Sequence, residues 1–231
     1  MKAALRGLSS TVGTKILVAV SGVLLVGFVL QHLLGNLQIY LGPNVFNSYA
    51  AGLKGLGPLV WIARAGLLAA LVVHLVGIAK LTLRNRTARP QAYDTKLPIV
   101  STFASRNMLM SGGILLAFII YHLLHFTIGV THPEHFTMVD DFGRHDVYSM
   151  VILGFRQPLV SLSYIVAMGL LGLHLGHGVA SLFQTAGLTG RNWRATFEGA
   201  GRLIAVVVVL GNISIPLACL FGLIQPLSEA L

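Results

Sequence analysis

The sequence predicts an all-α integral membrane protein with five transmembrane helices. Apolar residues make up 55% of the 231 residues and charged residues only 10%, whereas soluble domains carry roughly 25% charged residues. Five long apolar runs approach the ~20 residues that a helix needs to cross a bilayer. A backbone in hydrocarbon must satisfy its own hydrogen bonds, and runs this long without period-two alternation do so as helices rather than barrel strands.

The first charge-free run covers residues 16–37, and we expect a helix over about residues 14–37. Basic residues ending in Lys15 precede this run, as they do in a signal peptide. The run is too long for the apolar part of a signal, and it carries His32 and Asn36 where a small-residue cleavage site would be expected. We therefore expect this first helix to be retained.

The other four apolar runs cover residues 59–79, 107–130, 158–183 and 203–224. The helices expected from them span about residues 59–82, 104–130, 158–183 and 201–225. Residues 1–231 then form a single transmembrane domain. Its longest extramembrane link, residues 131–157, is expected to include a short surface helix.

The basic residues indicate how these helices are oriented. The N-terminal segment and the links at residues 80–106 and 191–202 hold 12 of the 16 Lys and Arg residues. The positive-inside rule then places the N-terminus in the cytoplasm and the C-terminus outside. The net charge of +9 is explained by this topology, and no nucleic-acid partner is expected.

Cysteine usage limits the chemistry that this chain can hold. Cys219 is the only cysteine, which excludes intrachain disulfides, a C-x-x-C-H haem attachment and any cysteine-ligated cluster within the chain. Redox chemistry here would therefore need a non-covalent cofactor held by other ligands.

Each of the first four predicted helices carries a histidine about 16 or 17 residues after its start: His32, His74, His122 and His174. A lone histidine in such a helix serves as an interhelical hydrogen-bond partner or a proton-relay element as well as a ligand. Residues 28–34 and 118–124 share the pattern F-x-x-x-H-L-L. That pattern is typical of a duplicated helical hairpin, although short apolar strings also match by chance.

Depth sorts the four histidines into two pairs. His32 lies 17 residues beyond Lys15 and His122 lies 16 beyond Arg106, which at 1.5 Å per residue puts both about 25 Å from the cytoplasmic boundary. The second and fourth helices run the opposite way, so the same arithmetic from the prolines that begin them places His74 and His174 near the cytoplasmic side.

Paired imidazoles favour haem over other metal centres. A planar macrocycle between two helices is held by one imidazole from each side. Bare zinc or copper would usually need a third or fourth ligand, and no carboxylate or thiolate lies at either depth. Glycines near the histidines leave room for such a ring, or equally serve close helix packing. We expect the first four helices to form a haem-binding bundle, with iron ligated by His32 and His122 in one site and His74 and His174 in the other.

Other polar residues are candidates for the edges of these sites. His125 and His177 lie three residues after a candidate ligand, on nearly the same helix face and about 4.5 Å closer to water. They are candidate contacts of haem propionates or of a quinone. Lys15 and Arg106 lie at the inner edge and Arg64 at the outer edge, where each could meet a propionate or simply reach to water as an interfacial anchor.

Several strings resemble a known family. These are QHLL at residues 31–34, FNSYA at 46–50, YHLLHF at 121–126, DVYSMVILGFRQP at 146–158 and LHLGHGVASLFQTAG at 173–187. From about residue 15 to the start of the fifth helix, the chain resembles the cytochrome b subunit of succinate:quinone oxidoreductases and fumarate reductases, in the five-helix, two-haem class.

The resemblance implies a membrane anchor of respiratory complex II, the succinate dehydrogenase of the tricarboxylic acid cycle, in the cell inner (cytoplasmic) membrane. It would pass electrons between a cytoplasmic iron–sulfur subunit, with its FAD flavoprotein, and a membrane quinone, menaquinone or ubiquinone. The dicarboxylate chemistry would lie on the partner, and no side chain of this chain would be catalytic. Carried over by residue, His32 and His122 ligate the outer haem b, and His74 and His174 the inner haem b.

Alternatives remain open at this level. Some fumarate-reducing members carry a glutamate two residues before the ligand of the fourth helix, where this chain has Gly172. That difference favours succinate oxidation over a fumarate reductase running in reverse. A cytochrome b serving another dehydrogenase and an anchor without haem are further possibilities. A proton-coupled transporter would need intramembrane acids, and none of the seven acidic residues lies in a predicted span.

Overall fold

The computed structural model describes residues 10–88, 103–188, 190 and 193–227. Five helices in this part of the chain are long and apolar enough to cross a membrane. They are α2 (Thr11–Leu37), α4 (Pro58–Thr87), α6 (Met108–His122) continued by the π-helix η2 (Leu123–Ile128), α9 (Pro158–Thr185) and α10 (Arg194–Leu220). The described residues contain no strand, only an isolated bridge. The prediction of an all-α, multi-pass membrane protein is therefore confirmed.

Local chemistry sets where these helices begin. The Ser10 side chain caps α2 by accepting a hydrogen bond from the Gly13 amide at 3.0 Å, which satisfies one of the free N–H groups of the first turn. Both α4 and α9 begin with proline, whose fixed φ suits the first helical position. The largest differences from the predicted bounds are in α4, which continues to Thr87 rather than ending near residue 82, and in α10, which begins at Arg194 rather than near residue 201 and ends at Leu220.

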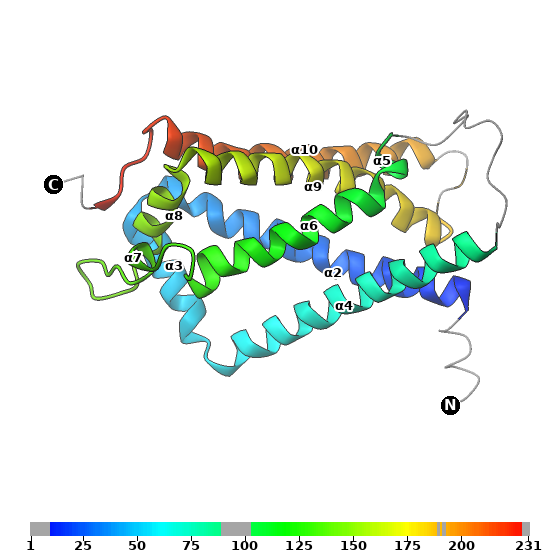
Figure 1. Ribbon diagram of the computed structural model, residues 1–231, viewed down its shortest axis with the longest axis horizontal. Coiled ribbons are helices and arrows are strands. Elements are labelled where there is room, and N and C mark those ends of the chain that lie inside the picture. Colours follow the sequence, from blue (N-terminus) through cyan, green and yellow to red (C-terminus); the bar gives the residue numbers. More distant parts are fainter. Residues whose placement is uncertain (1–9, 89–102, 189, 191–192, 228–231) are drawn as a thin grey trace.

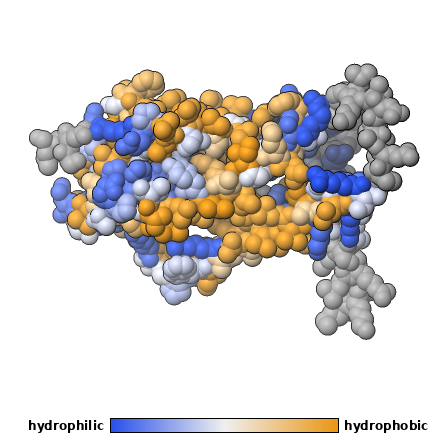
Figure 2. Space-filling view, in the orientation of Figure 1, coloured by the Kyte–Doolittle hydropathy of each residue, from blue (hydrophilic) through white to orange (hydrophobic). Residues whose placement is uncertain are grey.

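The long helices form two unequal groups. Helix α9 packs against α6, α10 and α2, whereas α4 packs mainly along α2 (Figure 1). Only 6% of the most apolar stretch of α4 is buried inside the molecule, whereas 33% of the corresponding stretch of α10 is buried. Figure 2 shows an apolar band across the middle of the molecule, with polar residues gathered toward its two ends. This is the surface that a bilayer requires.

Short helices cover one end of the bundle. These are η1 (Gln38–Leu41), α3 (Pro43–Gly55), α7 (Pro133–Phe136) and α8 (Val147–Phe155), and α5 (Phe103–Arg106) lies at the other end. The sequence predicted a surface helix between residues 131 and 157, but the longer helix of this link, α8, is largely buried. Its side chains join a core cluster that we call the end cap: Ile39, Phe46, Tyr148, Ile152, Phe155, Tyr164, Ile215 and Cys219.

A buried polar network ties the link to α3. The Asn47 amide nitrogen donates to Asp140 at 3.2 Å and to Asp146 at 3.0 Å, and its oxygen accepts from the Tyr148 amide at 2.9 Å. The Arg144 guanidinium pairs with Asp140 at 2.7 Å. Both side-chain polar atoms of Asn47 are thus hydrogen-bonded to the link, so this network attaches the link to α3.

The Asp140 carboxyl is the charged centre of this network. Burial raises its pKa, but hydrogen bonds from Arg144, Asn47 and the Phe142 amide outweigh burial, and the net pKa lies below the ordinary value of 3.8. A lowered folded pKa means that ionised Asp140 stabilises the fold at neutral pH. This contribution is lost as the pH falls below 3.8 through the lowered pKa.

Candidate functional site

The first predicted histidine pair meets between α2 and α6. The rings of His32 and His122 lie with centroids 5.7 Å apart and planes at 84°, and both side chains are half-buried. A metal ion bonded to one nitrogen of each ring at about 2 Å would place the centroids about 6 Å apart. The two rings therefore lie close enough for both to contact one bound group.

A tyrosine on α9 orients His122. The Nδ1 atom of His122 lies 3.3 Å from the Tyr164 hydroxyl, and Nδ1 of His125 lies 3.2 Å from the same oxygen. A tyrosine hydroxyl donates one hydrogen bond and accepts others, so it can serve both rings at once. With Nδ1 of His122 engaged by Tyr164, its Nε2 is left for another partner.

The second histidine pair is oriented by serines. Nδ1 of His74 on α4 lies 3.3 Å from Ser21 Oγ on α2, and Nδ1 of His174 on α9 lies 3.3 Å from Ser111 Oγ on α6. His74 and His174 thus each meet a serine of a neighbouring helix through Nδ1.

The serine hydroxyls favour one tautomer of these two histidines. Ser21 Oγ lies 2.8 Å from Leu17 O, and Ser111 Oγ lies 3.2 Å from Met108 O. A serine hydroxyl has a single proton, so when that proton goes to the backbone carbonyl, the oxygen accepts from the imidazole. In that arrangement each histidine carries its proton on Nδ1, and Nε2 is the nitrogen that could bind a metal.

The two hairpins repeat this arrangement. Ser21 and Gly22 stand 11 and 10 residues before His32, and Ser111 and Gly112 stand 11 and 10 residues before His122. A Cβ atom added to Gly22 would lie 3.7 Å from Cε1 of His74, and one added to Gly112 would lie 3.5 Å from Cε1 of His174. The α2–α4 and α6–α9 hairpins therefore place a serine and a glycine against a histidine in the same way, which supports the duplication.

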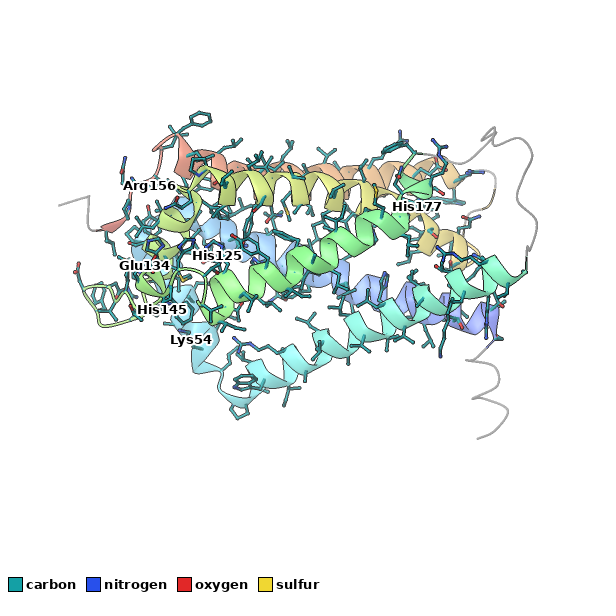
Figure 3. All side chains as sticks on the ribbon, in the orientation of Figure 1. Lys54, His125, Glu134, His145, Arg156 and His177 are labelled. Carbon is teal, nitrogen blue, oxygen red and sulfur yellow. The ribbon has the colours of Figure 1, made fainter. Side chains whose placement is uncertain are left out.

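His125 and His177 differ in burial and in the end of the bundle at which they lie. His125 is 3% exposed, stacks on Phe126 at 3.9 Å and lies against Gly154 of α8. His177 is half-buried near the other end of the bundle (Figure 3). His125 is thus enclosed beside Tyr164, while His177 remains partly accessible.

The three basic candidates all lie on the surface. Lys15 and Arg106 are exposed on α2 and at the end of α5. Arg64 is exposed on α4, and its guanidinium lies 4.9 Å from the centre of the Trp61 ring. An arginine beside a tryptophan at a helix end is typical of an interfacial anchor, so Arg64 fits that alternative well.

These residues fit the group that the sequence predicts. A haem of the predicted bis-histidine type needs an imidazole nitrogen from each of two histidines and an apolar surrounding. Hydroxyl groups engage Nδ1 of His74, His122 and His174, and all four candidate ligands are half-buried among apolar helices. Sequence reasoning missed Ser21, Ser111 and Tyr164. The shared Ser-Gly spacing before His32 and His122 was the signal that could have found the two serines.

Comparison of the chain with protein families, curated proteins and solved structures finds no match. The function must therefore be inferred from the residues and their geometry.

Proposed function

We propose that this chain is the dihaem cytochrome b anchor of a succinate:quinone oxidoreductase. The observation that carries the proposal is the repeated site geometry. Each hairpin sets Nδ1 of a histidine 3.3 Å from a serine of its neighbouring helix, which makes Nε2 the nitrogen available for a metal. A proton relay would not need one nitrogen to be reserved in this way, whereas a metal ligand does.

The resemblance strings support the choice of complex II, because they surround both histidine pairs. Residues 146–158 form α8 and the turn into α9, and their side chains Tyr148, Ile152 and Phe155 pack in the end cap around Tyr164. Residues 173–187 carry His174 and complete α9. The strings that suggest the family are thus those that build the two candidate sites.

When bound, haem supplies one-electron transfer between a reductant and a quinone. The chain's own residues ligate, orient and shield the group. The histidine Nε2 atoms would serve as ligands, while Ser21, Ser111 and Tyr164 would orient His74, His174 and His122 by their Nδ1 atoms. The apolar helices exclude water. This is an electron-transfer role, with dicarboxylate chemistry on an iron–sulfur and flavoprotein partner at the basic, cytoplasmic end.

Gly172 supports succinate oxidation rather than the fumarate-reducing alternative. A Cβ atom at Gly172 would lie 2.5 Å from Cγ2 of Val209 on α10. Contacts under 3.0 Å require a shift of the neighbour, so α10 leaves little room for any side chain at this position. The chain therefore lacks both the family's glutamate and ready space for it.

Purification of the membrane complex through a tag on this chain tests the proposal. We expect a reducible b-type spectrum with two haem b per chain, and co-purifying flavoprotein and iron–sulfur subunits that reduce quinone with succinate. Absence of haem would overturn the dihaem assignment. Two haems with a different dehydrogenase partner would instead favour the alternative cytochrome b, and would overturn the choice of complex II.

Replacement of Ser111 by alanine tests the orientation of His174. The variant removes the acceptor of the Nδ1 proton, and we expect the inner haem to be retained about 10-fold less tightly, as for other partners of metal-bound histidines. Haem loss to a competing apoprotein measures this. Ser163 on α9 is a matched control, because its hydroxyl donates only to Val160 O of its own helix. Equal haem loss from Ser163→Ala would contradict the role of Ser111.

A further inference from the structure

The tetrapeptide His132-Pro-Glu-His135 places three metal-binding side chains at the start of α7. One nitrogen of each histidine and one carboxylate oxygen of Glu134 all lie within 4.8 Å of one another. Oε1 of Glu134 is 3.4 Å from Nδ1 of His132 and 3.9 Å from Nε2 of His135. Figure 3 shows Glu134 at the end of the bundle that the short helices cover. We propose that these three residues bind a divalent transition-metal ion of the zinc class.

The donor set selects the class of metal. Two imidazoles and one carboxylate form a three-ligand zinc site that leaves a position for water. Imidazole suits zinc, copper and nickel, whereas magnesium and calcium take oxygen ligands. A tetrahedral ion with bonds of about 2.0–2.2 Å spaces its ligand atoms about 3.3 Å apart. The distances of 3.4 and 3.9 Å are already near that value.

The trio combines one exposed side chain with one buried nitrogen that has no hydrogen bond. The Glu134 side chain is 64% exposed, so its rotation meets little resistance. Nδ1 of His135 is buried and makes no hydrogen bond within the described part of the chain, so metal binding there would break none. The His132 and His135 rings already stack, with centroids 5.4 Å apart.

Neighbouring residues hold the turn in place. Pro133 occupies the first turn of α7. Gly129 has a φ of +77° and packs against the ring of Phe136 so closely that a Cβ atom there would clash with it. The His132 ring also lies 5.3 Å from the ring of His125, which is itself buried against α8. The three donors therefore project from a fixed turn, which reduces the entropy that binding would cost.

This site is separate from the candidate haem ligands. No residue of the trio is a predicted haem ligand, and the trio lies in the extramembrane link rather than in a span. The metal proposal therefore does not rest on the proposed function. A haem spectrum and a zinc titration of the same sample report on the two proposals independently.

Zinc titration of the full chain in detergent, after removal of bound metal with a chelator, tests the site. With a chromophoric zinc indicator as competitor, we expect one saturable site per chain. Glu134→Gln should weaken binding about 10-fold or more, since a lost interaction around a metal typically costs 10- to 100-fold. The combined Glu134→Gln and His135→Gln variant should abolish binding.

His145→Gln is the matched control in the same link. Nδ1 of His145 lies 3.2 Å from Nζ of Lys54, whose charge disfavours a metal ion, so this variant should bind zinc as the unsubstituted chain does. Elution of each variant as a single symmetric species shows that the fold is kept. The site is overturned if the unsubstituted chain binds no zinc, if the double variant binds as tightly, or if His145→Gln loses as much affinity as Glu134→Gln.

Discussion

Replacement of His122 by alanine is expected to remove one haem b and to leave the second in place. His122 lies beside His32 with ring centroids 5.7 Å apart, and under the proposed function loss of either imidazole would leave the haem with only one of its two histidine ligands. His32→Ala should therefore lose the same haem, whereas His74→Ala should lose the other one. A pyridine haemochrome assay gives the haem content, and a redox titration shows which of the two species is lost.

The pairing is contradicted if His32→Ala and His122→Ala lose different haems. A variant that loses both haems must be checked for folding. Cys219 permits that check, because it is the only cysteine in the chain and is 1% exposed. A thiol-reactive dye that labels Cys219 at ambient temperature would report an open fold. Loss of both haems with Cys219 still protected would overturn the division into two independent pairs.

Replacement of Asn47 by alanine is expected to lower the free energy of unfolding of the end cap by about 2–4 kcal/mol, because buried polar partners lose their hydrogen bonds. Asn47 is 1% exposed and is bonded to Asp140, Asp146 and the Tyr148 amide. Its loss leaves two buried carboxylates without a shared donor. The thermal midpoint of Cys219 labelling measures the effect directly, since Cys219 lies in the same core cluster.

Asn44 is the matched control for Asn47. It is an exposed asparagine on the same helix, and it accepts a hydrogen bond from Nη2 of Arg144 at 3.0 Å. Because exposed polar contacts contribute little, Asn44→Ala should cost about 0.5 kcal/mol or less. Equal midpoint shifts for the two alanine variants would mean that the buried network does not stabilise the end cap.

The five long helices could be predicted from the sequence, but their ends could not. Hydropathy shows where a chain leaves the bilayer, whereas backbone hydrogen bonds determine where a helix stops. Helix α4 passes Lys80 and continues through Arg84 and Arg86 to Thr87, because long basic side chains extend into water without breaking the helix. The burial of α8 was also missed, since its apolar residues stand beside charged ones in the sequence.

The contact between His32 and His122 could be predicted from their depth in the membrane alone. Counting residues from Lys15 and Arg106 puts His32 and His122 at one level, and their rings are adjacent in the structure. The hydroxyl partners of the histidines could not be predicted in this way. A contact such as Ser111 to His174 depends on the rotation of each helix about its axis, and helices that are apolar all round carry little sequence signal of that rotation.

The π-helix η2 has a consequence for how the repeat is recognised. The two hairpins align without a gap from Ser21 and Ser111 to His32 and His122. Directly after His122, η2 runs over Leu123–Ile128, whereas α2 remains α-helical to Leu37. A π-helix closes its hydrogen bonds one residue later than an α-helix, so equivalent positions move out of step there. Residues that match in sequence beyond this point therefore no longer face the same direction around the helix axis in α2 and in η2.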